Sequence, residues 1–158
     1  MELTFTTYRI KLNHTFGISR SAYDWYDIIY IYIKDGEIIG RGEAAPSLRY
    51  NESTKRILSI LKQKIKLPVD CSNRDEIWNF ILPQLKEVKA LEAAFSMALW
   101  DWWGQKNEKP VFELFNMKTD EMPLTSFTIA IGELDEIGQK IDEADPYHIL
   151  KVKLGTPK

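Results

Sequence analysis

The chain has 158 residues, 44% of them hydrophobic and 12% aromatic, so it is long enough to bury a hydrophobic core. Its 21 basic and 23 acidic side chains leave a formal net charge of -2 with no dense cluster of Lys and Arg, so we expect no nucleic-acid partner. The sequence contains neither a recognisable signal peptide nor an apolar run near the roughly 18 residues that cross a bilayer, which predicts a cytoplasmic protein without a membrane partner.

The first third of the chain predicts three antiparallel strands. Residues 2–12 and 27–34 are rich in Ile, Tyr, Thr and Phe, and Asp35-Gly36 is a hairpin-turn signal before a third strand at 38–43. Residues 14–25 lack a clean periodicity, so we predict a loop there. Loops of that length are often functional.

After Pro46 the apolar residues recur with a helical period, which predicts three helices. The first follows Asn51 and Ser53, either of which suits an N-cap, and the second begins after Ser72-Asn73 and runs to about Gln84. The third has the clearest amphipathic pattern and is expected to form the core of its unit, with these residues inside: Leu91, Ala94, Phe95, Ala98, Leu99 and Trp102. A short helical turn is expected from Pro110 to Phe115.

Residues 116–121 are polar enough for a linker, and the order beyond them is strand (124–131), helix (133–143) and strand (148–154). One βαβ unit cannot bury both faces of its own sheet. We therefore predict two domains, 1–118 and 119–158, of which the second is the start of a larger parallel α/β domain. The unpaired last strand also predicts self-association into a homo-oligomer.

Two lysines stand out at the predicted end of the last strand. Side chains alternate along a strand, so Lys151 and Lys153 project to one side and Val152 to the other. If that side lines a poorly solvated site, desolvation and mutual repulsion favour the neutral amine, and a lysine of this kind acts as a base near neutral pH. The alternative is a pair of exposed lysines near the chain end.

Four segments in order resemble the muconate-lactonizing-enzyme subgroup of the enolase superfamily, in particular its dipeptide epimerases: 40–46 (GRGEAAP), 49–52 (RYNE), 98–101 (ALWD) and 151–155 (KVKLG). The resemblance covers essentially the whole chain. It implies a fold class of an α+β capping domain, with a three-stranded antiparallel sheet and helices, followed by the first βαβ of an incomplete TIM-type barrel. Loops of such a capping domain close over the end of the barrel where the catalytic groups lie.

The resemblance also implies roles for the two lysines. Lys153 takes or returns the substrate α-proton, and Lys151 tunes it and helps to hold the enolate oxygen. The enediolate is stabilised by Mg²⁺, which three carboxylates on later strands hold. We therefore expect no metal ligands in this chain, and we expect them, with the second acid/base lysine, beyond Lys158.

Further substrate contacts follow from the same resemblance. Residues 16–20 match the capping loop, whose Phe16, Ile18 and Arg20 are expected to contact substrate, with Arg20 pairing with a carboxylate. A solvated surface arginine is the competing interpretation of Arg20. Tyr50 is expected to wall the pocket, unless it only packs, and Thr128 to hydrogen-bond substrate if the register of its strand permits.

Several functions remain open on these residues. The preferred one is the N-terminal part of a Mg²⁺-dependent epimerase of an Ala-Glu-type dipeptide, an isomerase in its complete form. Other Lys-x-Lys members are alternatives: cycloisomerases, o-succinylbenzoate synthases and N-acylamino-acid racemases. A non-catalytic module or fragment is a further alternative. Because an enediolate without its cation loses its largest stabilising interaction, residues 1–158 alone are predicted to be inactive.

Overall fold

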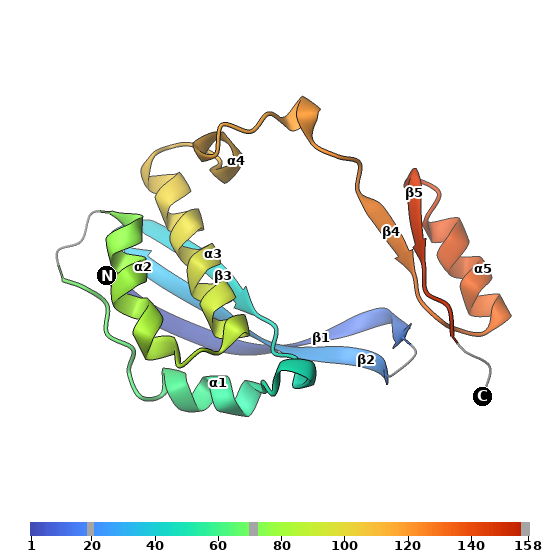
Figure 1. The fold of residues 1–158 in the computed structure, drawn as a ribbon, viewed down its shortest axis with the longest axis horizontal. Helices are drawn as coiled ribbons and strands as arrows, with labels where there is room; N and C mark the ends of the chain where they lie inside the picture. The colour runs from blue at the N-terminus through green and yellow to red at the C-terminus, as the bar shows by residue number, and fades with distance from the viewer. Residues whose placement is uncertain (19–20, 70–72, 156–158) are drawn as a thin grey trace. The chain divides into compact units, whose positions relative to one another are not determined.

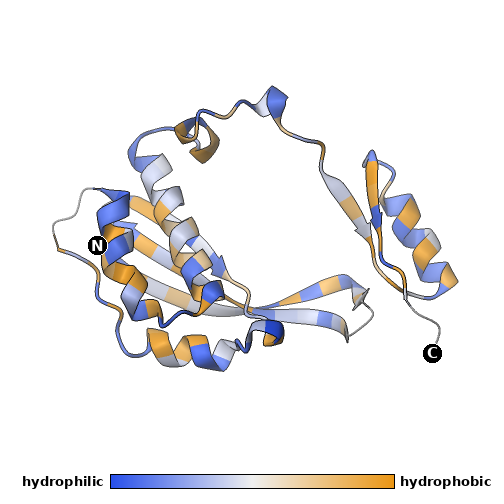
Figure 2. Ribbon diagram, in the orientation of Figure 1, coloured by the Kyte–Doolittle hydropathy of each residue, from blue (hydrophilic) through white to orange (hydrophobic). Residues whose placement is uncertain are grey.

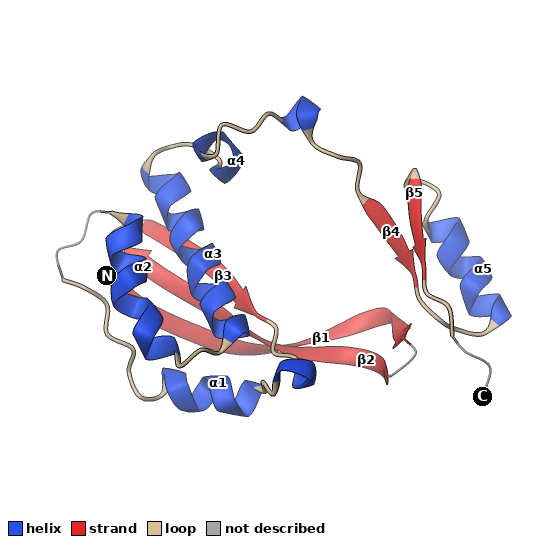
Figure 3. Cartoon of the chain, viewed as in Figure 1, coloured by secondary structure: helices blue, strands red, loops and turns tan. Residues whose placement is uncertain are grey.

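The computed structural model describes residues 1–18, 21–69 and 73–155, which form two compact units. The first unit comprises residues 1–9 and 27–118, and the second comprises residues 10–26 and 119–158. Figures 1 and 3 show the helices and strands of both. The division into domains at residues 118 and 119 stays a prediction.

The sheet contains three strands in the order β1 (Glu2–Ile18), β2 (Ser21–Asp35) and β3 (Ile38–Ala44), as the sequence predicted. Strands β2 and β3 are antiparallel, and the pairing of Asp35 with Ile38 leaves Gly36 and Glu37 as the turn residues. Gly36 has a φ of 61°, which a residue without a Cβ adopts at little cost. The turn therefore lies one residue later than the predicted Asp35-Gly36 pair.

The predicted loop at 14–25 is wrong, because β1 continues to Ile18 and β2 already begins at Ser21. Exposure alternates along this part of β1, where Leu12, His14 and Phe16 are half-buried and the residues between them are exposed. Across the hairpin the Thr15 hydroxyl donates to Asp24 Oδ1 at 2.6 Å. Cross-strand pairing, which local periodicity does not reveal, decides the conformation here.

The helices of the first unit begin near the predicted caps. Helix α1 (Thr54–Leu61) is capped by Ser53 and α2 (Arg74–Ile81) by Asn73; each side-chain oxygen accepts a backbone N–H of the first turn. The predicted second helix is split, because a 3₁₀ turn (Leu82–Leu85) containing Pro83 follows α2. Helices α3 (Lys89–Lys106) and the short α4 (Val111–Leu114) complete the unit. Figure 2 shows hydrophobic and hydrophilic stretches side by side on α1 and α2.

Helix α3 forms the centre of the core, as its pattern predicted. All six of its predicted inward residues are buried, and they share one cluster with Ile29, Ile31 and Ile33 of β2. These three residues alternate along β2 and therefore lie on the face of the sheet that the helices cover. The Trp102 indole donates to Asp35 Oδ2 at 3.1 Å, which satisfies its only polar group inside the core.

The N-terminus of α3 lacks a cap from its own N-cap residue, Val88. Glu52, only 4% exposed, fills this role because its Oε1 accepts the Ala90 N–H at 3.2 Å. Glu52→Ala is expected to lower the free energy of unfolding by about 1–2 kcal/mol, measured by urea denaturation, because a buried N–H loses its acceptor. The control Glu76→Ala, on the exposed first turn of α2, should change it by less than about 0.5 kcal/mol. Equal effects of the two variants would refute this role of Glu52.

A bidentate ion pair joins β1 and β2 in the first unit: Arg9 Nε and a terminal guanidinium nitrogen donate to the two Asp27 carboxylate oxygens at 2.6 and 2.7 Å. The hydrogen bond from Arg9 holds the pKa of Asp27 below its ordinary value. The pair therefore adds stability above the unfolded-state pKa of this carboxyl, and the contribution disappears as pH falls through the lower folded-state pKa.

Titration of the Asp27 carboxyl by carbon NMR checks this shift. Arg9→Gln is expected to move the Asp27 midpoint upward, toward the value of a free aspartate. An unchanged midpoint would mean that other groups set the pKa of Asp27.

The second unit contains β4 (Ser126–Ile129), α5 (Leu134–Glu143) and β5 (Ile149–Val152). Strands β4 and β5 are parallel neighbours, so the predicted βαβ unit is confirmed. Gly17 of the hairpin also forms an isolated antiparallel bridge with Ile131, just after β4. Of the helices in the described ranges, none has the length and apolar character needed to cross a bilayer.

Candidate functional site

The parallel pair of strands brings Thr128 and Lys151 together. Thr128 of β4 is paired with Lys151 of β5, and paired residues of neighbouring strands point to the same side of a sheet. Lys153 follows directly after β5, and its backbone N–H donates to the Ile129 carbonyl at 2.9 Å, so the ladder continues to this residue. Lys151 is exposed and Lys153 is half-buried. The structure thus places one hydroxyl and two ammonium groups near the carboxyl ends of adjacent parallel strands.

A cavity of about 160 Å³ lies beside these strand ends, within the second unit. Phe16 and Thr128 both border it, so two predicted substrate contacts from distant parts of the sequence lie at one cavity. Among the described residues, the lining comprises Leu12, Asn13, His14, Thr15, Phe16, Phe127, Thr128, Ala130 and Lys140. Apolar walls with a few polar groups are typical of small-molecule sites.

The other predicted substrate contacts are Ile18, Arg20 and Tyr50. None of them is among the described residues that line this cavity. Arg20 lies outside the described residues, and so does the side chain of Ile18. Tyr50 belongs to the first unit, in a short 3₁₀ turn (Leu48–Tyr50), where its side chain is 64% exposed and the Arg49 guanidinium lies 6.0 Å from its ring centroid. The substrate roles of all these residues stay predictions.

Two basic side chains at the cavity were not predicted as part of the site. His14 Nε2 lies 2.8 and 2.9 Å from the two Glu143 carboxylate oxygens, which fixes the hairpin on α5. Lys140 of α5 is 3% exposed. A sequence signal for Lys140 exists, because it falls in step with Ile137 and Ala144 on the inward stripe of the helix.

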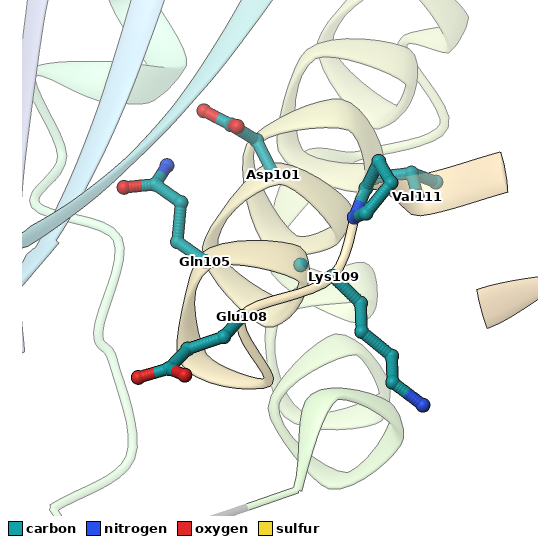
Figure 4. A pocket seen from close by; sticks show the side chains of 7 residues that line it. Asp101, Gln105, Glu108, Lys109 and Val111 are labelled. Atoms are coloured by element: carbon teal, nitrogen blue, oxygen red, sulfur yellow. The ribbon is translucent and has the colours of Figure 1, made fainter. Parts of the chain in front are cut away.

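A second concave feature lies in the first unit, at the C-terminal end of α3. This groove of about 310 Å³ is lined by Asp101, Gly104, Gln105, Glu108, Lys109, Pro110 and Val111, none of which was predicted as a site residue. In Figure 4 the side chain of Lys109 points away from those of Asp101 and Gln105. Asp101 accepts the Arg41 N–H at 2.8 Å and Gln105 donates to the Ile39 carbonyl at 2.8 Å. Both side chains therefore already serve to attach α3 to β3.

The described residues do not supply a ligand set for a metal ion. Among them, no group of three or more His, Cys, Asp or Glu side chains lies close enough together to hold one. A magnesium ion, which the family resemblance implies, therefore does not fit the described residues.

No family model matches the chain. It is 32% identical over 158 residues to an L-Ala-D/L-amino acid epimerase of Flavobacterium johnsoniae, a match that covers 99% of this chain and 47% of that protein. The chain thus spans about half the length of this curated relative.

Solved structures with the same fold are also about twice as long. An enolase-family member from Agrobacterium tumefaciens with homology to dipeptide epimerases, bound to sodium and L-Ala-L-Glu, matches with a TM-score of 0.72 and 26% identity, over 99% of this chain and 46% of that one. A dipeptide epimerase from Enterococcus faecalis, complexed with Mg and L-Leu-L-Tyr, matches with a TM-score of 0.77 and 25% identity, over 98% and 45%. The three-stranded sheet with its helices corresponds to the N-terminal capping domain of such neighbours.

Proposed function

We propose that this chain is the N-terminal part of a dipeptide epimerase, because it matches the N-terminal portion of dipeptide epimerases of the enolase superfamily. The reaction is removal and return of the α-proton at the carbon next to a carboxylate. The proposed substrate is an Ala-Glu-type dipeptide. The name of the Flavobacterium relative, an L-Ala-D/L-amino acid epimerase, supports the alanine, and the L-Ala-L-Glu ligand of the Agrobacterium neighbour supports the glutamate.

The observation that carries the proposal is the pairing of Thr128 with Lys151 at the carboxyl end of two parallel strands. Catalytic groups of α/β barrels lie at this end of the strands. Lys153 is the proposed acid/base group that exchanges the α-proton on one face of the substrate. Lys151, on the same side of the sheet, is the proposed cationic neighbour of the enolate oxygen, and Thr128 a hydrogen-bond donor to the substrate.

Magnesium is proposed for the complete protein only, on the precedent of the Enterococcus neighbour. A divalent cation stabilises the charge that develops on the enolate oxygen. The described residues offer no cluster of ligands for it, so residues 1–158 alone are proposed to be inactive. A cytoplasmic location and self-association through the edge of β5 also stay predictions.

Exchange of the substrate α-proton with deuterated water, followed by proton NMR with L-Ala-L-Glu and Mg²⁺, tests the proposal. Residues 1–158 are compared with a hybrid in which the second half of the Flavobacterium epimerase follows residue 155, and the intact Flavobacterium enzyme is the positive control. We expect exchange by the hybrid and none by residues 1–158. A hybrid that is folded by circular dichroism but exchanges neither L-Ala-L-Glu nor L-Leu-L-Tyr would contradict the proposed function. Exchange by residues 1–158 would contradict their inactivity.

A further inference from the structure

Lys140 is a buried cation whose charge is poorly compensated. Its Nζ has no hydrogen-bond partner among the residues that the structure describes. The nearest carboxylate oxygen in an ion pair, Glu136 Oε2, is 3.7 Å away, beyond hydrogen-bond distance. An ammonium group carries three donors, and leaving a buried charge without acceptors is strongly unfavourable. An acceptor from outside the chain would remove this cost.

The space around Lys140 favours such an acceptor. Lys140 borders the cavity of about 160 Å³, which is well above the roughly 10–15 Å³ that a single water molecule needs. On the side of Gly132 the space is already filled, because a Cβ there would lie 2.5 Å from Glu136 Oε2 and 3.0 Å from Lys140 Nζ, so the cavity is where an outside acceptor can approach.

The residues that line the cavity favour an anion, although three carboxylates contact them: Glu136 at Lys140, Glu143 at His14 and Asp24 at Thr15. None of the nine described residues that line it is Asp or Glu, and Lys140 is the one lysine or arginine among these nine. The other polar groups are mostly engaged: His14 is bound to Glu143, and the Thr15 hydroxyl donates to Asp24. Thr128 adds a hydroxyl group to the lining.

We propose that this cavity is a binding site for the carboxylate of a small molecule, with the Lys140 ammonium as its counter-charge and Thr128 as a hydrogen-bond donor. The apolar walls at Leu12, Phe16, Phe127 and Ala130 suit a short aliphatic body attached to that carboxylate. The volume admits a short monocarboxylate or the carboxylate end of a dipeptide. The inference needs only the second unit and does not depend on epimerase activity.

The test is a titration of the isotope-labelled 158-residue chain, followed by proton–nitrogen NMR. Propionate and L-Ala-L-Glu are the carboxylate probes, and propionamide, of the same shape but neutral, is the control ligand. We expect saturable shifts of the backbone amides of residues 12–16 and 137–141 with a carboxylate, and none with propionamide. If the dipeptide binds and propionate does not, the carboxylate that this site takes is that of the substrate. If propionate binds, a free short-chain acid suffices. Absence of saturable shifts with both would overturn the proposal, and so would equal shifts with propionamide.

Variants separate the charge of Lys140 from its packing. Lys140→Met keeps the length of the side chain and should weaken binding at least tenfold, whereas Lys140→Arg should retain it. Lys109→Met, at the groove of the first unit, is the matched control and should have no effect. The half-exposed Glu136 carboxylate competes with a bound carboxylate for the Lys140 ammonium group. Glu136→Gln removes that competitor and should tighten binding about threefold or more. If Lys140→Met does not fold, unchanged affinity in Glu136→Gln overturns the proposal.

Discussion

Replacing Lys153 by Ala in the active hybrid is expected to lower the rate of α-proton exchange by at least about 100-fold. A positioned acid/base group contributes roughly 10²–10⁴-fold to a proton transfer, and Ala leaves no group that accepts the proton at this position. The half-buried Lys153 follows β5 directly and its backbone is tied to Ile129, so truncating its side chain leaves the strand pairing intact. Proton NMR in deuterated water with L-Ala-L-Glu measures the rate.

The matched control for this prediction is Lys109→Met, which removes an exposed lysine from the first unit and should leave the rate unchanged. A folded Lys153→Ala hybrid that exchanges the proton within threefold of the parent would remove Lys153 from the chemistry. If the Lys153→Ala hybrid retains activity and the Lys151→Ala hybrid loses it, Lys151 is the acid/base group.

Gly42→Ala is expected to lower the free energy of unfolding by about 3 kcal/mol, the upper end of the usual cost of overpacking. Strand β3 approaches α3 so closely that a Cβ at Gly42 would lie 1.9 Å from the Ala94 carbonyl oxygen and 2.9 Å from the Ala98 nitrogen. These obstacles are backbone atoms in a helix, which cannot rotate away as a side chain would. The strand and helix must therefore separate in the centre of the core. Urea denaturation of the 158-residue chain measures the loss.

Gly138→Ala is the matched control. Gly138 lies inside α5 with no atom near the position of a new Cβ, so the same change should raise the free energy of unfolding of this part by about 0.5–1 kcal/mol through helix propensity. Similar losses in the two variants would show that close packing of β3 on α3 does not set the cost at Gly42.

Local patterns in the sequence were sufficient to predict two kinds of feature. These are helices whose apolar residues recur with a strict period, and caps formed by residues that are close together in the sequence. The apolar stripe of α3 predicted its six buried residues, because a helix that packs on a sheet must repeat its apolar side chains every three to four residues. Ser53 and Asn73 marked the starts of α1 and α2 because a cap is a local hydrogen bond. The strand–helix–strand order of the second unit was equally readable.

The tertiary structure alone decided the features that depend on contacts between distant residues. The hairpin at 14–25 pairs as strands although its sequence has no clean period, because Thr15 and Asp24 meet across it and Gly17 meets Ile131. The helical period placed Lys140 on the inward stripe of α5, but only the folded chain shows that this lysine, a residue type that is normally exposed, is 3% exposed.

For the candidate site, the sequence by itself determined that Lys151 and Lys153 share one side of a strand, because side chains alternate with a period of two. It did not determine which residue stands opposite them. That depended on the register of β4 against β5, which sets Thr128 beside Lys151. A shift of one residue would turn the Thr128 side chain to the other face of the sheet. Register is a property of two strands and of the packing that holds them together, and so only the folded chain decides it.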